Sequence, residues 1–303
     1  MRVVVHGQQT FGRAVLERLL ERGDNVVAVC TEPDRAGRPV DPLKEFAVEK
    51  GLPVSQPASW KTPEALEIMR SFDADVCMMA YVLLLVPKRV LDAPKLGSFQ
   101  YHPSLLPMHR GPSSINWPIA MGATKTGLTV FWPDDGLDEG PILLQKPCDI
   151  GPDETLGDVY FKKLFPIGID AMVEALDMVA AGTAPRIEQD LSKGSYESWF
   201  TKADATVDWS KPAQRTYNII RASNPQPGAW TVHGGRELTI FDTRLAEGAG
   251  KPGEVLGVSD EGITVAAGDG AIRIMRVRAG GGKIPAAEYA AASGLKAGDV
   301  LGD

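Results

Sequence analysis

The chain has few cysteines, no long apolar run and no excess of positive charge, and each shortage excludes a class of protein. Its three cysteines are an odd number without a Cys-x-x-Cys pair, so we expect neither a disulfide framework nor a structural zinc site. No apolar run reaches the roughly 18–20 residues that span a bilayer, and the first residues lack the apolar core of a signal peptide. The sequence therefore predicts a cytoplasmic protein without membrane attachment.

Acidic residues outnumber basic ones. With 39 Asp and Glu against 32 Lys and Arg, the net charge is −7 at pH 7. Proteins that bind nucleic acids neutralise phosphates with basic residues, and residues 205–303 hold no excess of them. We therefore do not expect tRNA as a partner. What is present is an ordinary globular composition of 303 residues, 44% of them hydrophobic, enough for about two domains.

Residues 1–185 alternate strands with helices. A β-branched strand at residues 2–6 precedes a helix at 13–22, and further strands follow at 25–30, 74–80 and 98–101. A helical pattern also covers residues 155–181. This alternation predicts a Rossmann-like α/β domain with a parallel sheet covered by helices on both faces.

The second part of the chain has a different pattern. Residues 186–204 are polar and mixed, as in a linker. After one more helix, residues 205–303 contain short strands separated by Gly and Pro, which predicts a small OB-like β-barrel domain.

The loop at residues 7–12, Gly-Gln-Gln-Thr-Phe-Gly, joins a strand to a helix, as phosphate-binding loops do. It lacks the G-x-G-x-x-G spacing that lets the backbone approach a pyrophosphate. We interpret it as an ordinary turn and expect no NAD.

His102 lies where a predicted strand ends, and Pro103 and Pro107 keep the following loop irregular. A histidine at the carboxyl end of a parallel strand lies in the usual ligand crevice of such sheets. A second loop follows the apolar strand at residues 127–131 and contains Asp138. Because each of the two residues follows an apolar strand, we expect His102 and Asp138 to converge at the carboxyl edge of the sheet.

His109 lies seven residues after His102, a spacing that raises the possibility of a metal pair. No carboxylates stand at ligand spacing, so we expect no metal site. We interpret His109 and Arg110 as residues that stabilise the loop.

Two motifs carry a family resemblance: His-Pro-Ser-Leu-Leu-Pro at residues 102–107 and Gly-Leu-Asp-Glu-Gly-Pro at 136–141. Together they resemble the formyltransferase family, whose members take a formyl group from 10-formyltetrahydrofolate and include methionyl-tRNA formyltransferase. The hydrolase domain of 10-formyltetrahydrofolate dehydrogenase is especially similar. Further matches extend the resemblance over the whole chain, at residues 109–111, 114–117, 131–132, 134–138, 143–146, 164–166, 203–209 and 227–231.

The resemblance implies roles for individual residues. His102 would stabilise the tetrahedral oxyanion and move protons, and Asp138 would fix the protonation of the imidazole and position a water. The folate would be the formyl donor, with no metal. Its implied contacts are the backbone of Leu84, Leu85 and Val86, and the loop of Ser104, Leu105, Leu106 and Pro107.

Gln100 departs from the family pattern, because most family transferases have an asparagine two residues before the histidine. The amide of Gln100 extends one methylene further, so it either contacts the oxyanion or simply faces a strand neighbour. This departure favours hydrolysis of 10-formyltetrahydrofolate to tetrahydrofolate and formate. The alternatives are formyl transfer to an amine (methionyl-tRNA, a sugar nucleotide or a small amine) and a folate-binding module without turnover. The acceptor and the oligomeric state stay open.

Overall fold

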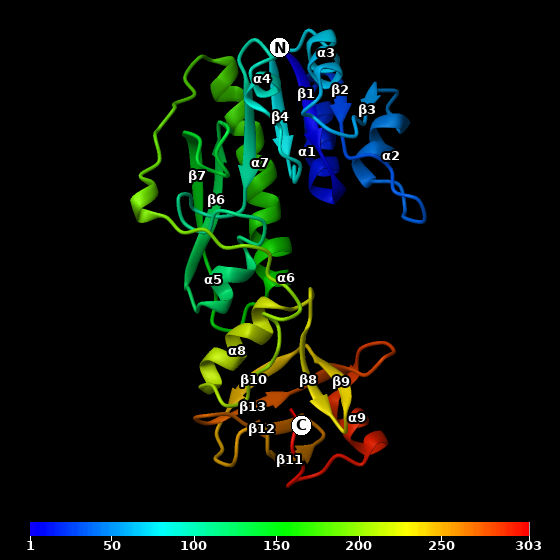
Figure 1. Cartoon of the computed structure of the whole chain (residues 1–303), viewed down its shortest axis with the longest axis vertical. Helices are drawn as coiled ribbons and strands as arrows, with labels where there is room; N and C mark the ends of the chain where they lie inside the picture. Colours follow the sequence, from blue (N-terminus) through cyan, green and yellow to red (C-terminus); the bar gives the residue numbers. More distant parts are fainter. Residues whose placement is uncertain (303) are drawn as a thin grey trace. The chain divides into compact units, whose positions relative to one another are not determined.

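The computed structural model describes residues 1–302, which form two compact units (Figure 1). The first unit contains Met1–Ser114, Gly127–Cys148 and Lys163–Glu197. The second contains Ile115–Thr126, Asp149–Lys162 and the described chain from Ser198 onward. Each unit therefore draws on separate stretches of the chain, and the domain boundaries expected from the sequence remain a prediction.

A seven-stranded sheet with the order β3-β2-β1-β4-β5-β6-β7 forms the centre of the first unit. Its strands are β1 (Arg2–Gly7), β2 (Asn25–Cys30), β3 (Val54–Ser55), β4 (Val76–Ala80), β5 (Ser98–His102), β6 (Lys125–Phe131) and β7 (Ile142–Asp149). β1 to β5 pair in parallel, which confirms an α/β fold with a mostly parallel sheet. β6 is antiparallel to β5, so the expectation of parallel strands is wrong there. An apolar run shows that a strand is buried but not which way it runs.

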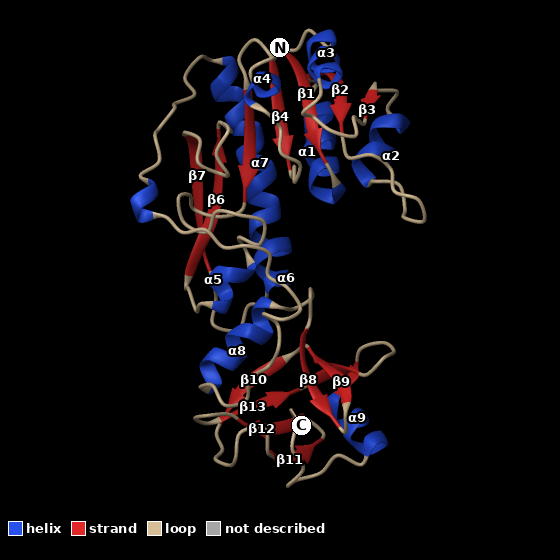
Figure 2. Ribbon diagram, in the orientation of Figure 1, coloured by secondary structure: helices blue, strands red, loops and turns tan. Residues whose placement is uncertain are grey.

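Helices cover both faces of this sheet (Figure 2). α1 (Gln9–Arg22) packs against α2 (Pro42–Glu49) and α7 (Phe165–Ala180) on one face. α3 (Pro63–Ser71) and α4 (Lys88–Leu91) contribute to the core on the other. α1 begins at Gln9 rather than at residue 13, because the Asp41 carboxylate accepts a hydrogen bond from the Gln9 N–H.

The helical pattern at residues 155–181 is not one helix. It divides into α6 (Leu156–Val159), a π-helical turn at Tyr160–Leu164, and α7. Pro166 lies in the first turn of α7, where its missing N–H is tolerated. Hydrophobic periodicity continues through such an interruption, so it did not mark the break.

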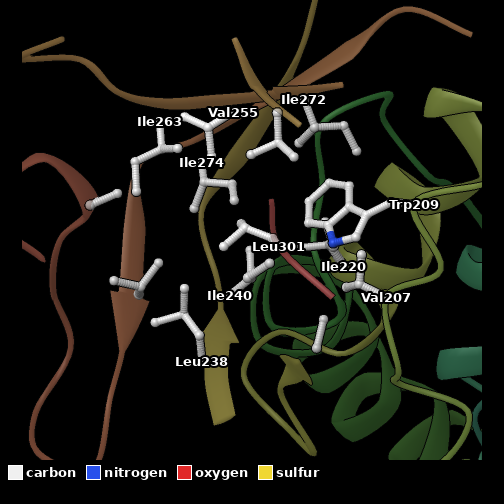
Figure 3. Packing of buried hydrophobic residues seen from close by; sticks show 14 of the residues in the cluster. Val207, Trp209, Ile220, Leu238, Ile240, Val255, Ile263, Ile272, Ile274 and Leu301 are labelled. Atoms are coloured by element: carbon white, nitrogen blue, oxygen red, sulfur yellow. The ribbon is translucent and has the colours of Figure 1, made fainter. Parts of the chain in front are cut away.

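The second unit contains two antiparallel four-stranded sheets, ordered β10-β13-β12-β11 and β15-β14-β9-β8. Their strands are β8 (Ala229–His233), β9 (Arg236–Ile240), β10 (Thr243–Ala246), β11 (Val255–Ser259), β12 (Gly262–Ala266), β13 (Ala271–Ile274), β14 (Arg276–Arg278) and β15 (Ile284–Pro285). α5 (Asn116–Ala120), α8 (Ala213–Ala222) and α9 (Ala286–Ser293) belong to the same unit. The expected domain of short strands is confirmed, the structure shows that the strands are antiparallel, and α9 was not foreseen. Figure 3 shows its apolar core, in which Trp209 lies near Leu301.

Buried thiols belong to the core of the first unit. Cys30 and Cys77 are buried beside α3 and α4, and burial raises the pKa of the Cys77 thiol to about 12. These two cysteines therefore stay protonated and unreactive near neutral pH. Within residues 1–302, no helix is long and apolar enough to cross a membrane.

Candidate active site

His102 ends β5, and its imidazole is held between two loops. The residue is 5% exposed. Its Nε2 lies 3.0 Å from the carbonyl oxygen of His109, and its Nδ1 lies 3.6 Å from Oδ2 of Asp138. Because a carbonyl oxygen only accepts hydrogen bonds, Nε2 carries the proton in this arrangement. In the neutral imidazole the free lone pair is then on Nδ1, the nitrogen that faces Asp138.

Asp138 reaches His102 by an indirect route. β6 runs antiparallel to β5 with Phe131, its last residue, opposite Gln100, so the carboxyl end of β6 points away from His102. The following loop turns back, and Asp138 adopts a left-handed φ of 55°. The two side chains therefore meet, but not because both follow parallel strands, as the sequence had led us to expect.

The two carboxylate oxygens of Asp138 have different surroundings. Oδ2 accepts a hydrogen bond from the backbone N–H of Gly111 at 2.8 Å. Oδ1 has no hydrogen-bond partner among residues 1–302. One oxygen thus anchors the side chain, and the other can accept a hydrogen bond from a water or ligand.

Gln100 lies two residues before His102 in β5, so both side chains are on one face of the sheet. Gln100 is half-buried, and its amide makes no hydrogen bond within the described part of the chain. The amide can therefore meet a ligand on the face that carries His102.

Apolar residues alternate in exposure along the loop that follows β4. Val82, Leu84 and Val86 pack on the core beside α3 and α4, whereas Tyr81, Leu83 and Leu85 are exposed. Leu84 and Val86 therefore offer a ligand mainly their backbone groups. Strand order reverses between β1 and β4, and open α/β sheets usually bind ligands at such a point.

The loop of residues 104–107 is braced by side chains from neighbouring strands. Thr129 Oγ1 accepts a hydrogen bond from the Leu106 N–H at 3.0 Å and donates to the Ser104 carbonyl at 2.7 Å. Gln145 Nε2 donates to the Leu106 carbonyl at 2.8 Å. Ser104 and Leu106 are buried, whereas Leu105 and Pro107 are half-buried. Several polar groups of this loop thus have partners within the protein, and its contact with folate remains a prediction.

His109 and Arg110 contact acidic residues rather than a ligand site. His109 Nδ1 lies 3.2 Å from Oε2 of Glu197, and Arg110 forms an ion pair with Glu139. Both contacts agree with a role in stabilising the loop. Across residues 1–302 there is no cluster of three or more His, Cys, Asp or Glu side chains arranged to hold a metal ion.

Sequence reasoning missed the residues that support this pair from outside its two loops. Gln189 Nε2 donates hydrogen bonds to the carbonyl oxygens of Asp138 and Gly140, at 3.0 and 2.7 Å. Ser195 Oγ accepts a hydrogen bond from the His109 N–H at 2.9 Å. Both residues lie in a polar segment without periodicity, so no sequence signal distinguishes them from solvated loop residues.

Two family models match the chain. Residues 1–176 match the formyl transferase model, and residues 200–294 match the model of the formyl transferase C-terminal domain.

Curated relatives fall into two groups. The cytosolic 10-formyltetrahydrofolate dehydrogenase of Xenopus tropicalis is 39% identical over 306 residues, which cover 95% of this chain and 34% of the relative. This chain thus spans about a third of the length of that dehydrogenase. The methionyl-tRNA formyltransferase of Geotalea daltonii is 37% identical over 308 residues, covering 100% of this chain and 98% of the relative.

Solved structures share the fold at lower identity. HypX from Aquifex aeolicus in complex with tetrahydrofolic acid matches with a TM-score of 0.68 and 20% identity, over 96% of this chain and 47% of that one. WlaRD, a sugar 3N-formyl transferase, matches with a TM-score of 0.69 and 17% identity, over 90% and 97%. From the matched family models and the methionyl-tRNA formyltransferase that matches over 98% of its length, we conclude that this chain belongs to the formyl transferase family, as its motifs had indicated.

Proposed function

We propose that the chain is an enzyme that hydrolyses 10-formyltetrahydrofolate to tetrahydrofolate and formate. The observation that carries the proposal is the buried His102–Asp138 pair, with Nδ1 and Oδ2 3.6 Å apart, in a formyl transferase domain. Among the solved structures of the same fold, one is a complex with tetrahydrofolic acid and another was determined with 5-N-formyl-THF. Both support a folate as the ligand, and the second supports a formylated one.

The first step is addition of water to the formyl carbon. Water held by Asp138 Oδ1 attacks the carbon and gives its proton to His102 Nδ1, which makes an imidazolium and a tetrahedral oxyanion. Nε2 cannot serve as this base, because its proton is donated to the His109 carbonyl. Asp138 Oδ2 stabilises the imidazolium, and proton transfer of this kind contributes about 10²–10⁴-fold to a rate.

The second step breaks the bond between the formyl carbon and N10 of the folate. N10 takes a proton from the imidazolium as it leaves, so His102 returns to its starting state. The electron pair of the oxyanion re-forms a carbonyl, so the products are tetrahydrofolate and formic acid, which releases its proton to solvent and becomes formate. No metal or redox partner is needed to balance this sequence.

Water as the acceptor is supported by Gln100. The family transferases that this chain resembles usually have an asparagine at this position, whereas the hydrolase domain that it resembles has an apolar residue. The glutamine amide is one methylene further from the backbone and no residue in 1–302 holds it in place, so the proposal assigns the main polar role at the formyl group to His102. The pterin is held by backbone groups of the exposed loop after β4, at the point where strand order reverses.

A second candidate is formyl transfer to an amine. It is favoured by the Geotalea daltonii methionyl-tRNA formyltransferase, which this chain matches over nearly its whole length. For tRNA itself the charge balance is unfavourable, since residues 205–303 carry no excess of Lys and Arg. Transfer to a sugar nucleotide or a small amine does not require an excess of Lys and Arg in this domain.

One assay separates these functions. The full chain is incubated with 10-formyltetrahydrofolate, and release of tetrahydrofolate and formate is measured without acceptor and with methionyl-tRNA, an amino-sugar nucleotide or a small amine. Hydrolysis predicts release without acceptor. Release that depends on an added amine would show that the chain is a formyltransferase and not a hydrolase. Binding of the folate without any release would show that it is a folate-binding module without turnover.

A further inference from the structure

Residues 187–197, which we call the strap, run along both loops that contact His102. At one end, Ile187 exchanges two backbone hydrogen bonds with Ile142 in β7. At the other, the Ser195 N–H donates to the Pro107 carbonyl, and the Arg110 N–H donates to the Ser195 carbonyl, both at 3.1 Å. The strap is therefore fixed at both ends to other parts of the first unit.

Gln189 joins the strap to the Asp138 loop. Its amide nitrogen donates to the carbonyl oxygens of Asp138 and Gly140, while its Oε1 is buried without a partner among the described residues. Rotating the amide by 180° would set Oε1 against two carbonyl oxygens, so only one orientation is favourable. Both N–H groups of the amide are thus used to hold this one loop.

Ser195 joins the strap to the other loop. Its Oγ accepts the hydrogen bond of the His109 N–H, and the carbonyl oxygen of His109 faces His102 Nε2. The strap also packs closely there: a Cβ on Gly194 would lie 2.5 Å from the Pro107 carbonyl oxygen. Ser195 therefore fixes the residue that sets the proton on His102.

The two residues that touch the His102 imidazole share an uncommon backbone conformation. Asp138 has φ of 55° and His109 has φ of 56°, in the left-handed region that residues other than glycine seldom adopt. Such conformations persist only where the surroundings hold them in place. For both residues, a side chain of the strap supplies a hydrogen bond to the backbone.

We infer that Gln189 and Ser195 are positioning residues, which hold Asp138 and His109 against the two nitrogens of His102. Neither side chain contacts the imidazole, so both act through the loops that they bind. The inference rests on the proposed function, because the rate of hydrolysis is the measurement that detects a displaced Asp138 or His109.

The test uses two variants of the full chain and a matched control. Gln189→Met keeps the length of the side chain but removes both donors, and Ser195→Ala removes the acceptor of the His109 N–H. Ser192→Ala makes the same substitution in the same strap, at an exposed residue whose hydroxyl donates only to Asp190. For each protein, kcat and KM for release of tetrahydrofolate and the unfolding midpoint are measured.

A displacement near 1 Å can reduce a rate about 100-fold, so we expect kcat to fall roughly 10- to 100-fold in Gln189→Met and Ser195→Ala, with KM within about twofold. Ser192→Ala should match the wild type. In an Asp138→Asn background, Gln189→Met should lower the residual rate no further, because the two changes act on one group.

Several results would overturn the inference. An unchanged kcat in Gln189→Met and Ser195→Ala, or a rise in KM alone, would show that the strap does not position the pair. A further loss of rate in the Asp138→Asn background would indicate a general structural role for Gln189. If Gln189→Met does not fold, Gln189→Glu tests the same contacts with a side chain of nearly the same shape. If neither variant folds, Gln189 is needed for folding and is not a positioning residue. Absence of release from the wild type would instead overturn the proposed function, and this inference with it.

Discussion

In the proposed site, His102 at the end of β5 carries the chemistry, whereas folate binding is assigned to a different segment, the loop after β4. His102→Ala removes the base at Nδ1 and should lower the hydrolysis rate by about 10²–10⁴-fold. Affinity for 5-formyltetrahydrofolate, measured by calorimetry, should stay close to wild type, since the backbone of Leu84 and Val86 is untouched. His233→Ala, which removes a hydrogen bond to Tyr289 in the second unit, is the control. If His102→Ala lost folate binding together with activity, His102 would have a structural role instead of a catalytic one.

Gln100 allows a test of what decides the acceptor. Its amide has no partner in residues 1–302, so nothing within the protein holds it on a developing oxyanion. We therefore expect Gln100→Ala to be nearly silent in hydrolysis, and Gln100→Asn to raise transfer to added amines. If the amide does bind the oxyanion, Gln100→Ala should lower kcat by about 10²–10³, the usual result of losing one such donor. A hundredfold loss with unchanged folate binding would disprove our expectation.

His6 makes stability depend on pH. It is buried in β1 with its ring 4.7 Å from that of Trp60, and burial lowers its pKa to about 3. Its pKa in the unfolded chain is about 6.5, so between these values the unfolded state binds the extra proton. The contribution of neutral His6 to the free energy of unfolding is therefore fully present well above pH 6.5. It is lost as the pH falls toward 3, and the loss is about 2 kcal/mol at pH 5.

Urea unfolding at pH 7.5, 6 and 5 measures this contribution. His6→Phe, which keeps a ring beside Trp60, should flatten the dependence over this range. The lowered pKa of Asp158, about 2, acts only in more acidic solution and does not interfere. An unchanged pH dependence in His6→Phe would assign the acid sensitivity to other groups.

Among the elements, α1 and α2 share one acidic residue at their starts. Asp41 Oδ1 accepts from the Leu43 N–H at 2.9 Å as the N-cap of α2, and both carboxylate oxygens accept from the Gln9 N–H at the start of α1. Asp41→Ala should destabilise the first unit by about 1–2 kcal/mol, the upper part of the range for a cap. Thr62→Ala, which removes the single hydrogen bond that caps α3, should give a smaller loss in the same urea titration. Equal losses would show that the contact with Gln9 adds nothing.

Elements with strong local signals could be predicted from the sequence, and those that depend on partners could not. The β-branched run of β1 and the three-to-four spacing in α1 are local, and both elements were foreseen. The start of α1 depends on Asp41, far along the chain, and the direction of β6 depends on which strand it joins. At the site, His102 and Asp138 belong to recognisable motifs. Gln189 and Ser195 act through single hydrogen bonds across long sequence separations, which no local pattern marks.

Over the whole chain, each unit includes segments that are distant in sequence. The large buried cluster shown in Figure 3 comes from Val207 to Leu301, although the second unit also buries apolar residues of its earlier segments, such as Ile119 and Val159. Its helix α8, however, binds the earlier segment at residues 149–162. Tyr217 Oη donates to Asp153 Oδ1 at 2.6 Å, and Arg221 donates to the carbonyl oxygens of Gly151 and Glu154. The later residues thus form the large apolar cluster, while Tyr217 and Arg221 on α8 bind polar partners from earlier in the chain.

This division predicts how the second unit behaves alone. A fragment of residues 198–303 should fold cooperatively, because it retains the whole cluster from Val207 to Leu301, but with lower stability than the same region in the full chain. Tyr217→Phe should destabilise that region of the full chain by about 1 kcal/mol, the usual contribution of one hydrogen bond, and should be silent in the fragment, which lacks Asp153. Urea unfolding followed by circular dichroism compares the four proteins. Equal losses in the full chain and the fragment would mean that the Tyr217 hydroxyl is stabilised from within residues 198–303. A fragment that stays unfolded would show that the cluster needs the earlier segments of the unit, residues 115–126 and 149–162, to form, since its own apolar contacts would then be too few to offset the conformational entropy of the chain.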